Sequence, residues 1–128
     1  MKEKGIRVLM VEPHKHPVVT TLENSLDTLQ KAVSIGAEEQ GLIEIVAIDD
    51  GVCILCNEEG KLIGLEGNRR VGQDIIAGVF YVVGEDGYGN LTSLDEQELL
   101  AYQRHFWNIE EYTQEDLEQA MTVQFWAF

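Results

Sequence analysis

The chain of 128 residues is 45% hydrophobic and 25% charged, which is typical of one globular domain and excludes a disordered or low-complexity chain. A domain of this length buries enough apolar surface to fold without a disulfide or a structural metal. Its formal net charge of -14 disfavours direct binding to nucleic acid or to an anionic membrane.

Negative charge is concentrated in the second half of the chain. Residues 1–70 carry a net charge of -4, whereas residues 71–128 carry -10 and contain one basic residue, Arg104. A basic protein partner is therefore favoured, and mimicry of a polyanion is the most concrete form of that hypothesis. The alternative is that the acidic residues serve solubility alone.

The sequence predicts a cytoplasmic protein. The first seven residues form a charged segment, in which four side chains are charged. No uncharged apolar run approaches the roughly 20 residues of a membrane span. We therefore expect neither a secretory signal nor a membrane segment, and we expect Cys53 and Cys56 to stay reduced.

The first half of the chain predicts strands around one helix. Short, β-branched apolar stretches predict strands at 6–11 and 18–22, and an apolar stripe at i, i+3 and i+7 predicts a helix over 25–35. Asp-Gly and Glu-Gly turns then predict a meander of three strands, at 42–48, 52–56 and 61–65. The helix is expected to cover one face of this sheet.

The second half begins with a polar loop and a buried strand. Residues 67–73 are expected to form the loop. Residues 75–83 are the most apolar stretch and predict one central strand, in which Gly78 suggests a bulge or a close approach. A glycine-rich turn over 84–90 follows.

Two helices are expected near the end of the chain. Ser93 and Glu96 fit a capping box that begins a helix over 94–105, and acidic residues favour a second helix over 114–121. Residues 123–128 alternate like a strand or pack as an aromatic tail. The whole pattern predicts a single α+β domain over 1–128, with an antiparallel or mixed sheet of about five strands and two or three helices packed on it.

Three stretches resemble a known family. They are IRVLMVEP, DDGVCILCNEEGKLIGLEGNRR and DIIAGVFYVVGEDGYGNLTSL, together with the helix behind them. They are similar to an uncharacterised bacterial family, a domain of unknown function found in conjugative elements, plasmids and phages of Gram-positive bacteria. The resemblance covers residues 5–106 and leaves 107–128 as an acidic, aromatic extension. It implies an accessory protein of a mobile genetic element and supplies no activity.

Adjacent basic residues make the candidate ligand- or partner-binding site. Asn68, Arg69 and Arg70 lie in a glycine-flanked segment, and Asp74 can orient one guanidinium. This arrangement predicts recognition of an anionic nucleotide or metabolite, which makes a small-molecule-binding module the alternative function. The competing interpretation is a structural loop held by ion pairs.

The two cysteines and two histidines are weak candidates for a metal site. Cys53 and Cys56 form a single CxxC, and His14 and His16 are the residues that complete a four-ligand zinc set. In a strand, positions 53 and 56 point to opposite faces, so packing is favoured over metal or redox chemistry. We expect no cofactor.

Aromatic residues crowd the end of the chain and are the candidate interface. The set consists of Phe106, Trp107, Tyr112, Phe125 and Trp126. Such residues pack in a core or serve an interface, of which a homodimer is the simplest form.

The sequence favours binding over catalysis. It contains no activated nucleophile and no distinct acid–base pair, so a small enzyme is the least favoured hypothesis. The favoured function is an accessory protein that binds another protein through an acidic surface, with anti-defence or antirestriction inhibition by polyanion mimicry as the specific version.

Overall fold

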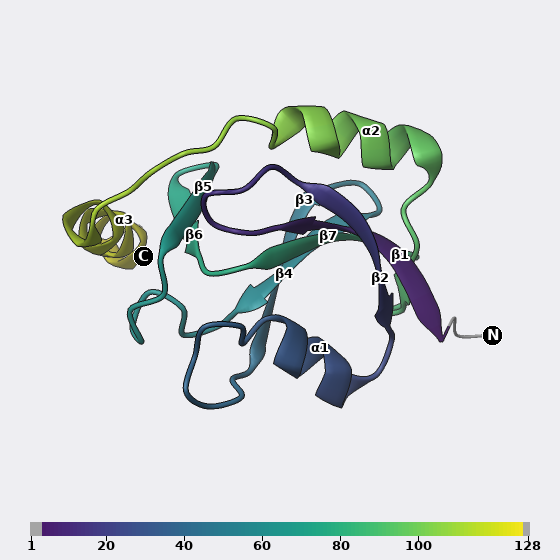
Figure 1. Ribbon diagram of the computed structural model, residues 1–128, viewed down its shortest axis with the longest axis horizontal. Coiled ribbons are helices and arrows are strands. Elements are labelled where there is room, and N and C mark those ends of the chain that lie inside the picture. The colour runs from purple at the N-terminus through teal and green to yellow at the C-terminus, as the bar shows by residue number, and fades with distance from the viewer. Residues whose placement is uncertain (1–3, 127–128) are drawn as a thin grey trace.

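The computed structural model describes residues 4–126, with side chains described up to Ala120. It contains a six-stranded antiparallel sheet, a separate two-stranded ribbon and three helices, which confirms the predicted α+β class (Figure 1). Along the sheet the strand order is β2-β1-β7-β4-β3, and β8 pairs with β7. No helix of the described residues is both long and apolar enough to cross a membrane.

The sheet strands are β1 (Gly5–Val11), β2 (Val18–Glu23), β3 (Ile43–Asp49), β4 (Val52–Asn57), β7 (Phe80–Glu85) and β8 (Leu91–Thr92). The ribbon consists of β5 (Gly67–Val71) and β6 (Asp74–Ala77), and the helices are α1 (Leu26–Ala32), α2 (Glu96–His105) and α3 (Gln114–Trp126).

Helices cover both faces of the sheet, so the central strands β4 and β7 are mostly apolar. All six residues of β4 are buried. Alternate residues of β4 serve different cores, because successive side chains of a strand point to opposite faces. Ile54 and Cys56 pack with Leu99 and Phe106 of the α2 side. Leu55 packs on the opposite side, in the core that contains Leu29 of α1.

The ribbon and α3 form a smaller third core beside the sheet (Figure 1). Ile75 and Ala77 of β6 pack against Leu117 and Ala120 of α3. The chain that leads to α3 lies close to β5: a Cβ atom on Gly67 would lie 2.8 Å from Cβ of Tyr112. A glycine at position 67 therefore allows the ribbon and the α3 segment to meet.

Three local predictions between residues 61 and 83 were wrong. Residues 61–65 form turns instead of a third meander strand, and most of the predicted polar loop is strand β5. The predicted strand 75–83 is broken at Gly78, which has φ +84° and donates its N–H to the Glu66 carbonyl (2.7 Å). The break separates β6, which pairs with β5, from β7 in the main sheet.

Helix ends also differ from the predictions. Asp95, not Ser93, caps α2, and the capping box is completed by Glu98. Ser93 instead accepts a hydrogen bond from the Arg7 amide (2.9 Å), which holds the start of α2 to β1. Helix α3 continues to Trp126, so residues 123–126 are helical and do not form the predicted strand. The side chains of the alternative aromatic tail over 123–128 lie outside the described residues.

Candidate functional site

Asn68 and Arg69 are buried and hold three segments together. The Arg69 guanidinium donates to the carbonyls of Phe106 (3.0 Å) and Lys15 (2.8 Å) and to Asn68 Oδ1 (2.8 Å). Asn68 Nδ2 donates to the carbonyls of Val11 (2.8 Å) and Gly78 (2.9 Å). We call this pair the Asn68–Arg69 clasp, because it ties β5 to the β1–β2 loop and to the end of α2.

The clasp leaves Arg69 no exposed surface for a ligand. The side chains of Asn68 and Arg69 are both 0% exposed. Burial lowers the pKa of the Arg69 guanidinium, while Glu110 and Tyr112 nearby act in the opposite direction. The geometry therefore supports a structural role for Asn68 and Arg69 instead of the anion recognition predicted for them.

Arg70 and Asp74 lie near the surface of the ribbon but are engaged locally. The Arg70 guanidinium lies 5.7 Å from the centre of the Tyr112 ring, and the Arg70 amide donates to Glu110 (2.9 Å). Asp74 forms an ion pair with Lys61. The structure thus places the four predicted residues on one ribbon, with two inside the protein and two on its outer side.

The cysteines are packing residues on opposite faces of β4. Cys53 lies in the α1-side core and Cys56 in the α2-side core. Burial, with a carboxylate of Glu85 near Cys53 and of Glu44 near Cys56, raises the pKa of the thiols to about 11 and about 12. Both thiols are therefore protonated at neutral pH, which is opposite to an activated nucleophile.

The histidines occupy the β1–β2 loop and contact different partners. His14, with φ +65°, bonds to Glu66. His16 stacks on Trp107 with ring centres 4.0 Å apart and bonds to its carbonyl oxygen (2.7 Å). Within residues 4–120, no three His, Cys, Asp or Glu side chains gather in a way that could hold a metal ion.

The predicted aromatic interface is divided by the fold. Phe106 is buried against Phe80 in the α2-side core. Trp107 is 47% exposed, and Tyr112 is half-buried beneath Arg70. The side chains of Phe125 and Trp126 lie outside the described residues.

Many carboxylates of the second half are engaged in local hydrogen bonds or ion pairs. Asp95 and Glu98 cap α2, and Glu96 pairs with Arg7. Glu85 and Asp86 bond to amides of the turn that follows β7. These five carboxylates therefore have local structural roles.

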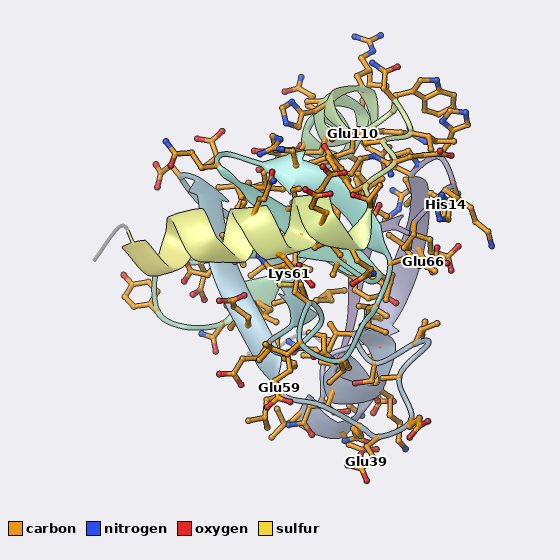
Figure 2. All side chains as sticks on the ribbon, turned by 90° about the vertical axis from the view of Figure 1, so that its left-hand side faces the viewer. His14, Glu39, Glu59, Lys61, Glu66 and Glu110 are labelled. Carbon is orange, nitrogen blue, oxygen red and sulfur yellow. The ribbon has the colours of Figure 1, made fainter. Side chains whose placement is uncertain are left out.

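A different set of carboxylates, drawn from both halves, shares one side of the molecule. Figure 2 looks onto the side that carries α3, and Glu39, Glu59, Glu66 and Glu110 are spread over it. We call this side the acidic face. Neighbouring carboxylates extend it, because Glu38 lines the same hollow as Glu39 and Glu59, and Glu111 lies 3.9 Å from His14.

Part of the acidic face has no neutralising partner. Lys61 is paired with Asp74, and His14 is paired with Glu66. Glu38, Glu39 and Glu59 are exposed and form no ion pair with any basic side chain of the described residues. Sequence reasoning missed these three residues, although the adjacent pairs Glu38-Glu39 and Glu58-Glu59 were a visible signal.

Residues 6–107 match a family described as a domain of unknown function (DUF3846). The chain belongs to the DUF3846 family. The DUF3846 match includes the Asn68–Arg69 clasp and its acceptor Phe106, whereas α3 lies beyond the match. Neither the curated proteins nor the solved structures give a match to the chain.

Proposed function

We propose that this chain is a non-enzymatic accessory protein that binds a basic partner protein through the acidic face. The observation that carries the proposal is the group Glu38, Glu39 and Glu59, which is exposed without a basic counterpart among the described residues. Unpaired carboxylates of one sign create a field that steers cationic partners and repels anionic ones.

The finer version of the proposal concerns the partner and its setting. We infer an inhibitor of a nucleic-acid-binding protein, acting by polyanion mimicry in the cytoplasm of a cell that carries a mobile genetic element. The sequence resemblance supports the mobile-element setting, and the net charge of -14 supports the mimicry. This version predicts that duplex DNA competes with the chain for the partner.

The proposal is tested by two triple variants that change the net charge equally. The face variant is E39Q/E59Q/E111Q, and the control is E23Q/D50N/E96Q, whose positions belong to β2, the β3–β4 turn and α2. Binding of a lysine-rich peptide is measured by titration calorimetry at low and at physiological salt. Exposed ion pairs of about 0.5 kcal/mol each predict a roughly tenfold loss for the face variant.

The control variant separates the face from the overall charge. Its neutralised residues act on a peptide bound at the face only from a distance. Salt screens such long-range interactions, because the Debye length is about 8 Å at physiological ionic strength. We expect less than about a threefold loss there. Equal losses in the two variants would mean that the peptide responds to net charge alone, and the proposal would be wrong.

A further inference from the structure

The acidic face is hollowed between two segments, residues 35–41 and 57–66. One hollow of about 440 Å³ is lined by Ile35, Gly36 and residues 64–66. A second hollow of about 490 Å³ is lined by residues 36–41 and by Asn57, Glu59 and Ile63. Gly36 lines both hollows, so they are neighbours, and we call the two together the trough.

Carboxylates stand at both ends of the trough. Glu66 lines the first hollow, while Glu38, Glu39 and Glu59 line the second. Lys15 is the basic side chain that lines the first hollow, and its ammonium is paired with Glu12 (3.2 Å). Within the described residues no basic side chain lines the second hollow. The trough therefore attracts positive charge mainly in the second hollow, while Glu66 in the first hollow also bonds to His14.

Apolar side chains also line both hollows of the trough. Ile35 is 52% exposed and Ile63 is 48% exposed, and each lines one of the two hollows. Buried Leu65 and Val79 also line the first hollow. A site for a simple cation needs no such surface, whereas an alternating peptide has apolar side chains to place there.

A buried amide donor lies beside the trough without an acceptor. Asn57 is 5% exposed, and its Oδ1 accepts from the Glu59 amide (2.9 Å), but its Nδ2 has no acceptor among the described residues. The Nδ2 atom lies beneath Gly41, where an added Cβ would come within 2.7 Å of it. An unsatisfied buried donor is costly, so an acceptor that reaches Nδ2 would be stabilised.

We propose that the trough binds an extended segment of the partner protein in which lysine or arginine residues flank an apolar residue. The cationic side chains pair with Glu66 at one end and with Glu39 and Glu59 at the other. The apolar residue packs on Ile35 and Ile63. A backbone carbonyl of the segment displaces Gly41 and accepts from Asn57 Nδ2. This inference rests on the proposed function and assigns it a location and a ligand.

The inference is tested with two labelled heptapeptides that share their charge, one alternating lysine with leucine and the other lysine with serine. Fluorescence anisotropy with the full chain is expected to show the leucine peptide bound about tenfold more tightly, since burying one apolar side chain contributes over 1 kcal/mol. The variant I35S/I63S is expected to lose this preference and to keep its binding of the serine peptide.

Matched charge variants locate the cationic contacts. E39Q/E59Q is expected to weaken both peptides about fivefold, whereas E111Q/E115Q, which changes one residue before α3 and one in its first turn, changes binding less than about twofold. The Asn57 side-chain amide protons are expected to move downfield in nuclear magnetic resonance spectra when the leucine peptide binds, because they gain an acceptor.

The possible failures are distinct. Equal weakening by the two charge variants, or a leucine preference that survives I35S/I63S, would overturn the trough and leave the acidic face as the binding surface. The absence of salt-dependent binding of either peptide would overturn the proposed function as well. Displacement of the peptide by an equal concentration of spermidine would show that the trough takes a free amine and not a protein segment.

Discussion

Arg69 is a cation inside the protein whose charge is held by carbonyl oxygens. Its side chain donates to carbonyls of two segments distant in the sequence, at Lys15 and Phe106. In the sequence, Arg69 and Arg70 are indistinguishable adjacent arginines, and strand alternation sends them to opposite sides of β5. Which of the two is buried depends on what packs on each side, and a single sequence does not specify that.

Replacing Arg69 separates its role from that of Arg70. R69M leaves the carbonyls of Phe106 and Lys15 without this donor inside a largely buried site, so we expect the free energy of unfolding in urea to fall by about 3–5 kcal/mol. R70M removes an exposed guanidinium of equal size and is expected to cost less than about 1 kcal/mol. Similar losses from the two variants would show that the clasp does not stabilise the fold.

Three buried acids give the protein a weakness at alkaline pH. Burial, with Glu12 nearby, raises the pKa of Tyr81 to about 12, and burial raises the pKa of Cys53 to about 11 and of Cys56 to about 12. The unfolded chain loses these protons at lower pH than the folded protein. The folded state therefore binds more protons above about pH 8.5, and stability falls as the pH rises.

The two cysteines should account for about 3 kcal/mol of lost stability between pH 8.5 and pH 10. Urea unfolding at a series of pH values measures this loss. The double variant C53A/C56A starts from a lower stability because it creates cavities, but its stability should be almost independent of pH in this window. If the stability of the double variant fell with pH as steeply as that of the unchanged chain, the two cysteines would not be the cause of the loss.

At the scale of elements, the correct predictions rest on local signals. The Asp-Gly turn between β3 and β4 is present, with Gly51 at φ +74°, and apolar periodicity located α1. The predictions failed where non-local contacts decide the structure. Gly78 separates β6 from β7 because β6 pairs with β5 while β7 lies between β1 and β4. No pattern within residues 75–83 records those neighbours.

The start of α2 offers a test of an element boundary. The Asp95 side chain accepts from the Glu98 amide (2.8 Å), and Glu98 accepts in return from the Asp95 amide (2.9 Å). D95A should lower the free energy of unfolding by about 1 kcal/mol, since the helix loses its cap. Q97A, an exposed change in the same turn, should be close to neutral. Thermal or urea unfolding of the two variants compares them directly.

At the scale of the whole molecule, the order of the predicted elements indicated the fold class, but the distribution of charge along the chain did not predict the acidic face. The acidic half of the sequence and the acidic face of the structure overlap only in part, at Glu110 and Glu111. Glu39 and Glu59 come from the less acidic half and share one hollow, while several later carboxylates are used in caps and turns. A face assembled from distant segments depends on the tertiary structure, so a charge count along the chain does not predict it.

The central claim is that the acidic face is where a cationic partner binds. Its most direct test is amide chemical-shift mapping of the full chain by nuclear magnetic resonance during titration with a lysine-rich peptide. The account predicts shift changes confined to residues 36–41, 57–66 and 110–111, which diminish as salt is raised. Changes centred on β2 or α2, or spread evenly over the molecule, would contradict it.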